Sequence, residues 1–324
     1  MTITQLQVRA RRLGAGLYYG SLRALRIPAL RRRRPGAAVI LCYHNVVAAD
    51  DDSTGAPGLH IRRDRFEQQV RWLADHYAVV PLSELIRPHS ARTSRPLAAI
   101  TFDDGYAGVF EHAVPLLGRL GIPATVFVVA GAPGRPAGGV PTAHACAVGC
   151  PGFWWDQPGV IRMLTPALRD LWLHRLRGDT AAILSEAQDS RVAPLPPACR
   201  PADWATIRAH ASRGMEIGVH SATHRCLTTL TDRELEYEIE ASRTVIHAET
   251  GIWPEFFSYP YGLSDARVRA AVREAGYRAA VGLEGCVSGS AVDRWALPRV
   301  PVPSEISESA FEAWTAGLHG CFAD

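Results

Sequence analysis

Short apolar runs alternate with longer, helically periodic segments along most of this chain. The runs are rich in β-branched and aromatic residues, which is typical of buried strands in a parallel sheet. Strands are predicted at 37–42, 97–102, 124–130, 215–219, 256–259, 277–283 and 295–300. Helices are predicted at 64–76, 106–120, 203–213, 231–250 and 264–275, with a last helix around 311–318. Seven or eight strands joined by helical crossovers predict an α/β barrel rather than an open sheet.

Two segments depart from this alternation. Residues 131–202 are rich in glycine and proline and contain one predicted helix, at about 167–187. We expect them to form an insertion that makes a lid or a wall over the site. The expected organisation is a basic N-terminal tail at 1–35 and one barrel at 36–324 that carries the insertion.

The basic charge of the chain is concentrated near its N-terminus. All 35 basic residues are arginine, and nine of them lie in the first 34 positions, where there is no acid; the rest carries 26 arginines and 32 acids. A basic amphipathic segment resting on an anionic membrane and a solvated, partly disordered tail both fit this composition. The mildly acidic body argues against a nucleic-acid enzyme, so no nucleic-acid partner is expected.

Several features bear on the cellular compartment. No stretch of about 20 uncharged apolar residues is present, and arginines interrupt every apolar run near the N-terminus, so neither a spanning helix nor a secretory signal is predicted. Seven scattered cysteines then favour reduced thiols, and hence the cytoplasm or the cytoplasmic face of a membrane. Cys146 and Cys150 have a spacing that suggests structural zinc, but two further ligands at similar spacing are missing.

Two adjacent carboxylates follow the predicted strand at 97–102. Asp103 and Asp104 leave that strand in different directions, and Gly105 lets the backbone turn sharply. One carboxylate is then free to bind a metal while the other handles a proton. An Asp-Gly turn in which Asp104 caps the next helix is the alternative interpretation.

Two histidines and a tyrosine follow other predicted strands. His220 and His224 come after one strand, and their spacing of four places both imidazoles on one side of a helical turn, which suits one metal. Tyr261 follows another strand. Because strand ends of a parallel barrel share one face, we expect all three to converge with the two aspartates. Two histidines and one carboxylate leave open positions on a divalent ion, as in a catalytic site.

Three segments, in this order, resemble the first three motifs of the polysaccharide deacetylases, carbohydrate esterase family 4. They are Thr101-Phe102-Asp103-Asp104-Gly105, His220-Ser221-x-x-His224 and Tyr259-Pro260-Tyr261-Gly262. The resemblance spans about residues 37–302. It implies a distorted (β/α) barrel of about seven strands and metal-dependent removal of an acetyl group from an N-acetylated sugar.

The resemblance also implies roles for individual residues. Asp104, His220 and His224 are implied to hold the metal, and Asp103 to act as the general base. The backbone N–H of Tyr261 is implied to help bind the oxyanion and so to contact the substrate.

Two parts of the common family pattern are missing. The third motif usually carries an arginine that braces the base, whereas Phe256-Phe257-Ser258 stands here, and no Leu-x-His segment near the C-terminus supplies a general acid. We expect Arg299, at the end of the last predicted strand, to brace the base; a structural ion pair is the alternative. We expect His44 to act as the general acid that protonates the leaving amine. A branch of the family that includes exopolysaccharide deacetylases has a similar Tyr-His motif near its N-terminus. A histidine that is merely hydrogen-bonded at the rim of the barrel is the alternative.

Two residues of the insertion are candidates for substrate contact. Trp155 and Asp156 are expected to line the glycan groove, although the tryptophans of this segment also fit a small core of its own.

The sequence thus predicts a metal-dependent N-deacetylase that acts on N-acetylhexosamine in a bacterial surface polysaccharide or its lipid-linked precursor. Zinc is the expected metal, with nickel, cobalt and iron as alternatives. An O-acetyl esterase with the same residues and a non-catalytic glycan-binding module stay open as other functions. The basic tail is the expected place of any peripheral membrane contact.

Overall fold

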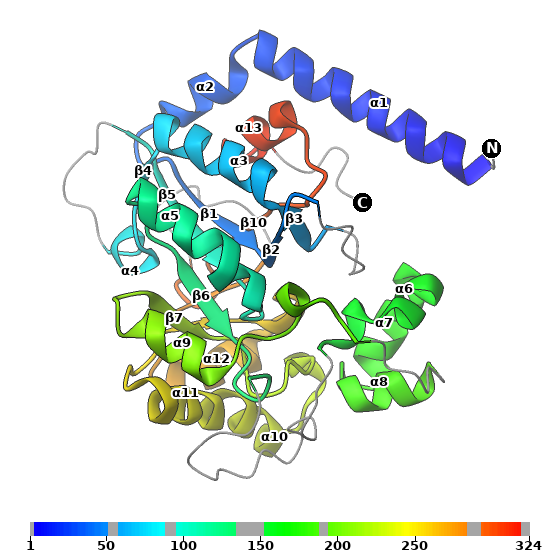
Figure 1. Cartoon of the computed structure of the whole chain (residues 1–324), viewed down its shortest axis with the longest axis vertical. Helices are drawn as coiled ribbons and strands as arrows, with labels where there is room; N and C mark the ends of the chain where they lie inside the picture. The colour runs from blue at the N-terminus through cyan, green and yellow to red at the C-terminus, as the bar shows by residue number, and fades with distance from the viewer. Residues whose placement is uncertain are drawn as a thin grey trace.

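The fold is a distorted (β/α) barrel, as predicted, with parallel strands curled around an interior and helices outside them (Figure 1). The structure is a computed structural model and describes residues 3–50, 58–87, 95–133, 152–187, 194–283 and 293–318, with side chains from residue 13 onward. Cys146 and Cys150 lie outside the described residues, so the zinc pairing considered for them stays a prediction.

Seven parallel strands form the barrel wall in the order β10-β1-β5-β6-β7-β8-β9. They are β1 (Ala38–Tyr43), β5 (Leu97–Phe102), β6 (Thr125–Val128), β7 (Glu216–Val219), β8 (Phe256–Ser258), β9 (Ala279–Val281) and β10 (Val300–Pro301). A short strand, β4 (Ala78–Val79), pairs with the start of β5. Another two, β2 (Asn45–Val47) and β3 (His60–Arg62), form a separate parallel pair that hydrophobic periodicity did not predict.

Helices follow most strands and cover the outside of the wall. They are α3 (Arg63–His76), α5 (Val114–Leu120), α9 (Trp204–Ala211), α10 (Asp232–Glu236), α11 (Ser242–Thr250), α12 (Ala266–Glu274) and α13 (Glu308–Thr315). The helix predicted at 106–120 contains a π-helical turn at Val109–Ala113 before α5, and a second π-helical turn, Tyr237–Ala241, joins α10 to α11. A capping box formed by Thr231 and Glu234 starts α10.

Alternation along the strands separates two apolar layers. On β1, Val39 and Leu41 pack in the large cluster under the outer helices, whereas Ile40 belongs to a second cluster with Phe127 and Phe256 inside the barrel. Side chains two residues apart on a strand share a face. We call the positions whose side chains face the inside of the barrel the inward series of a strand. Where this series continues past the end of a strand, its side chains point into the mouth of the barrel. The helix α4 (Leu82–Leu85) contributes both of its leucines to the inner cluster and closes the other end.

The last predicted strand is much shorter than expected. Only Val300–Pro301 pairs with β1, while upstream a single parallel bridge joins Leu297 to Val281. Pro298 has no N–H and cannot continue the ladder, which accounts for the interruption. The inward alternation nevertheless persists, because Leu297 lies in the inner cluster and Arg299 comes two residues later.

The insertion forms a small helical group beside the barrel (Figure 1). Its helices are α6 (Pro158–Met163), α7 (Pro166–Arg175) and α8 (Thr180–Glu186). The prediction of one helix at 167–187 is wrong. Arg177 and Gly178 adopt left-handed conformations with φ of 56° and 70°, which end α7, and the Asp179 carboxylate then accepts from the Ala182 N–H to start α8.

The N-terminal segment forms two helices, α1 (Ile3–Ala24) and α2 (Ile27–Arg32), which lie along α13 (Figure 1). Tyr19 is buried there, and its hydroxyl accepts a hydrogen bond of 2.9 Å from the Trp314 indole. Arg23 forms an ion pair of 3.1 Å with Glu312 of α13. None of the helices in the described part of the chain has the length and apolarity that a membrane span requires.

Candidate active site

A buried carboxylate and a buried guanidinium meet in the mouth of the barrel. Asp103 follows β5 and Arg299 precedes β10, and both are on the inward series of their strands. Arg299 Nη1 donates to Asp103 Oδ1 at 2.7 Å and Nη2 donates to Oδ2 at 2.6 Å. Two hydroxyls complete the arrangement, since Arg299 also donates to Thr101 Oγ1 and to Ser258 Oγ. The structure thus places Arg299 where the sequence expected a brace for Asp103.

This pairing controls the charge of Asp103. Burial alone raises the pKa of the carboxyl, but the Arg299 guanidinium outweighs that effect and holds the pKa well below its usual range. Asp103 in turn raises the pKa of Arg299, against the effect of burial. Both groups are therefore ionised at neutral pH, and the barrel mouth contains a fixed carboxylate.

The second aspartate faces the two histidines. Asp104 Oδ1 lies 3.5 Å from His220 Nε2 and 3.3 Å from His224 Nε2, and all three side chains are buried. Asp104 and Gly105 both have left-handed backbone conformations, with φ of 71° and 68°, and this turns Asp104 away from Asp103. The two carboxylates thus enter one site from different sides.

The loop that carries the histidines is not helical. Ser221 and His224 have φ of 63° and 59°, so the expectation that a helical turn aligns the two imidazoles is wrong. A tight loop brings them together instead. The buried Glu238 carboxylate accepts hydrogen bonds from the N–H groups of Ala222 and Thr223 at 3.0 and 2.9 Å and holds this loop from behind. Burial raises the pKa of Glu238, although these hydrogen bonds partly oppose the rise.

The arrangement of Asp104, His220 and His224 fits a divalent metal ion. His220 Nδ1 lies 2.8 Å from the Ser258 carbonyl oxygen, which only accepts, so Nδ1 carries the proton and the lone pair of Nε2 faces Asp104. Burial lowers the pKa of both imidazoles, which favours neutral ligands. Among the described residues no group donates to Asp104 Oδ1. Lone pairs that face one another in a buried site repel unless a cation lies between them.

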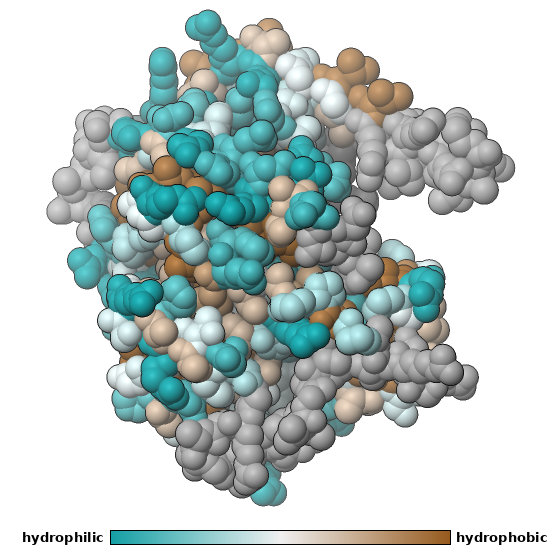
Figure 2. All heavy atoms as spheres, in the orientation of Figure 1, coloured by the Kyte–Doolittle hydropathy of each residue, from teal (hydrophilic) through white to brown (hydrophobic). Residues whose placement is uncertain are grey.

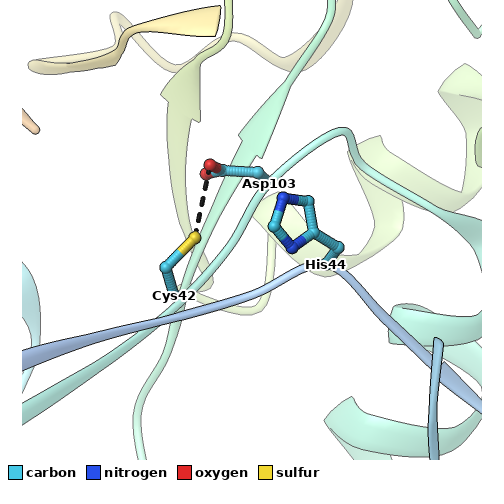
Figure 3. A group of neighbouring side chains, drawn as sticks. All are labelled: Cys42, His44 and Asp103. Carbon is cyan, nitrogen blue, oxygen red and sulfur yellow. Dashed lines mark hydrogen bonds between the residues drawn. The ribbon is translucent and has the colours of Figure 1, made fainter. Parts of the chain in front are cut away.

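His44 and Cys42 border the same mouth from the end of β1. Figure 3 shows the Cys42 thiol and the His44 imidazole next to the Asp103 side chain, with a dashed line from the thiol to the carboxylate. The thiol donates to Asp103 Oδ2 at 3.5 Å, and the ligating atoms of all three residues lie within 4.8 Å of one another. Burial lowers the pKa of His44 to about 4, so the imidazole is neutral at pH 7.

Aromatic rings form one wall around the cluster of Asp104, His220 and His224. The Tyr261 ring lies 4.6 Å from the His224 ring, and the Trp155 ring lies 4.5 Å from it, centroid to centroid. Tyr261 has φ of 60°, another left-handed residue at a strand end. Its hydroxyl accepts a hydrogen bond from the Trp154 indole at 3.2 Å. Trp155 and Tyr261 thus lie at the site, as expected, and their contact with substrate stays a prediction.

Asp156 lies behind this wall rather than in it. Its side chain is fully buried, with Oδ1 2.9 Å from His60 Nε2 and Oδ2 accepting from the Tyr106 hydroxyl at 2.7 Å. The same hydroxyl accepts from the Trp155 indole N–H at 2.9 Å. In this structure Asp156 therefore fixes the insertion to the barrel and orients Trp155, and direct glycan contact by Asp156 stays a prediction.

Several residues of the site were not among the functional residues predicted from the sequence. Thr101 and Ser258 lie two residues from inward-facing apolar side chains, so the period of two would have placed them in the barrel. His60, Tyr106 and Glu238 act across segments far apart in the sequence, and no local pattern marks them.

Comparison with known proteins gives one consistent family. The family model described as polysaccharide deacetylase matches residues 90–280. A Bacillus subtilis relative named for polysaccharide deacetylase activity, YxkH, is 23% identical over 267 residues, which cover 80% of this chain and 72% of the relative.

Solved structures give the same fold. The Streptococcus pyogenes deacetylase PplD in complex with acetate has a TM-score of 0.59 at 16% identity, over 89% of this chain and 100% of that one. A de-N-acetylase from Aggregatibacter actinomycetemcomitans has a TM-score of 0.56 at 18% identity, over 86% and 99% of the two chains. At these identities the likeness concerns the fold.

Proposed function

The chain belongs to the polysaccharide deacetylase family, and from this premise we propose that it is a metal-dependent N-deacetylase. The proposed substrate is the acetamido group of N-acetylhexosamine units in a bacterial surface polysaccharide or its lipid-linked precursor. The reaction consumes water and yields acetate and a free amine. The similarity in fold to a de-N-acetylase supports an amide substrate, and the family supports an acetylated glycan.

One observation carries the proposal. A buried Asp104 carboxylate oxygen faces the Nε2 atoms of both His220 and His224, next to a separate carboxylate that is held ionised by Arg299. These three residues would hold the metal, which we propose to be zinc, since two histidines and one carboxylate with open positions suit it; nickel, cobalt and iron are alternatives. When bound, the cation supplies a Lewis acid that polarises the acetyl carbonyl and acidifies water.

The remaining residues divide the proton transfers. Asp103 accepts the proton of the attacking water, and Arg299 keeps it ionised and oriented for that role. The backbone N–H of Tyr261 would donate to the developing oxyanion. His44 is neutral at pH 7, so it must first receive a proton, and Asp103 is within one water molecule of it. His44 then passes that proton to the leaving amine.

Two experiments test the metal and the bond type. Metal content per chain is measured for His220→Gln and His224→Gln, with the exposed His247→Gln as a matched control; we expect the first two to lose the metal and the control to keep it. Acetate release is then compared on matched amide and ester substrates. An esterase would release acetate from O-acetyl sugars alone, and a glycan-binding module would release none from either.

We also propose that the protein works in the cytoplasm or at the cytoplasmic face of a membrane. The free, buried thiols of Cys42, Cys199 and Cys226 support a reducing compartment. Cell fractionation with a thiol-labelling reagent tests this, and disulfide-linked protein in an extracytoplasmic fraction would contradict it.

A further inference from the structure

A basic cavity lies at the end of the barrel opposite the active site. It has a volume of about 270 Å³ and is lined by Arg31, Arg32 and Arg34, by Trp314, and by the chain around the start of β1. The active site follows the other end of β1, about 20 Å away for six extended residues. Ligands of the cavity and of the catalytic centre therefore do not touch one another.

The cavity has the chemistry of an anion site. No acidic side chain lines it, and none of the arginines at 31–34 forms an ion pair with a carboxylate of the described residues. The Arg32 guanidinium lies 4.9 Å above the Trp72 ring. Arginine guanidinium groups form charge-assisted, often bidentate hydrogen bonds with phosphate oxygens, so the arginines that line this cavity suit a phosphate group.

Exposed apolar side chains occur in the same N-terminal segment as these arginines. Leu25 is 67% exposed and Leu30 is 61% exposed, on either side of the start of α2, and Leu13 and Leu17 of α1 are 70% and 78% exposed. Figure 2 shows apolar side chains on α1 next to strongly polar ones. Four of the eight large apolar side chains that are exposed in the described residues thus lie within residues 13–30.

We propose that this surface docks on an anionic phospholipid bilayer, with a lipid phosphate in the arginine cavity and the exposed leucines in the interface. Arginines next to exposed leucines, with no acid in the first 34 residues, are complementary to an anionic bilayer in both charge and hydropathy. Nucleic acid would satisfy the arginines but would leave the leucines in water. The proposal is independent of the acetyl chemistry, because the two sites are at opposite ends of the barrel.

The test is sedimentation of the full chain with phosphatidylcholine vesicles, prepared with and without phosphatidylglycerol. We expect binding only to the vesicles that contain phosphatidylglycerol. The double variant Arg31→Gln/Arg34→Gln should bind about 25-fold more weakly, since each arginine contributes roughly a factor of five. Leu25→Ser/Leu30→Ser, which keeps the charge, should lose about tenfold or more.

A matched control shows whether binding depends on this particular surface or only on the total positive charge of the chain. Arg87→Gln/Arg119→Gln removes the same charge from exposed positions elsewhere and should bind as the unmodified chain does. The proposal would be overturned if both arginine pairs lost the same affinity or if the chain bound both kinds of vesicle equally well. It would also be overturned if the chain bound inorganic phosphate but no vesicles. Circular dichroism and acetate release from a soluble substrate report folding and activity separately, so a failure of the chemistry leaves the vesicle result interpretable.

Discussion

Removal of the Arg299 guanidinium should damage both the stability and the activity of the enzyme. Arg299 is 1% exposed and holds Asp103 with two hydrogen bonds of 2.6 and 2.7 Å. Arg299→Met leaves the Asp103 charge buried without its partner, which costs about 3–5 kcal/mol of unfolding free energy. In a domain of this size that corresponds to a fall in Tm of roughly 5–15 °C.

The second variant needed is Asp103→Asn/Arg299→Met, which removes both charges. Because a buried ion pair contributes little net stability over a neutral pair, the double variant should return to within about 1 kcal/mol of the original chain. Its activity should stay lost, because the base is gone. Thermal unfolding and acetate release, measured on the same samples, separate the two effects.

The pH dependence adds a readout that a purely structural role would not change. Arg299 lowers the pKa of Asp103, so its removal raises that pKa and moves the acid limb of kcat/KM to higher pH. Arg299→Lys keeps the charge but loses the planar fork, and we expect an intermediate shift. Additive stability effects in the double variant, together with an unmoved acid limb, would refute the assigned role of Arg299.

Two further predictions concern parts that support the site. Glu234 has a pKa lowered to about 2 by its hydrogen bonds to Thr231, so its contribution to stability is complete above about pH 4.5 and is lost as the pH falls through 2. Glu234→Gln should lower the free energy of unfolding by about 1 kcal/mol at pH 7, measured with urea, and by much less at pH 2. The exposed Glu236→Gln should cost little at either pH. Tyr106→Phe removes the hydrogen bonds of the Tyr106 hydroxyl to Asp156 and to the Trp155 indole. We expect a lower kcat and a weaker metal affinity with unchanged secondary structure. Unchanged metal affinity would argue against a positioning role for Tyr106.

Residues of the site could be predicted from the sequence where polar side chains follow the end of a predicted strand. The strand at 97–102 was predicted with its observed bounds, and Asp103 lies in the site because the inward-facing positions of a strand continue past its end. Asp104 enters the site through the left-handed backbone at Asp104 and Gly105. Arg299 was predicted against Asp103 because the family resemblance calls for a bracing arginine and Arg299 ends the last predicted strand, although most of that strand is reduced to a bridge at Leu297.

Other features depend on contacts that no local pattern records. The spacing of His220 and His224 indicated a helical turn, but left-handed residues fold this loop, and Glu238 holds it from a helix that lies later in the sequence. The orientation of Asp156 depends on His60, 96 residues earlier. The contact between Asp156 and His60 depends on how the insertion packs against the barrel. Hydrophobic periodicity within one segment cannot predict such a contact between distant segments.

Acetate release from an N-acetylglucosamine oligomer, by metal-loaded and metal-stripped protein, tests the proposed function most directly. We predict one metal per chain, release by the loaded protein alone, and loss of release in Asp103→Asn and in His44→Ala. Release by the stripped protein, or full activity in both variants, would contradict the proposed chemistry. A chain that binds one metal and releases acetate from neither amide nor ester would instead be a glycan-binding module.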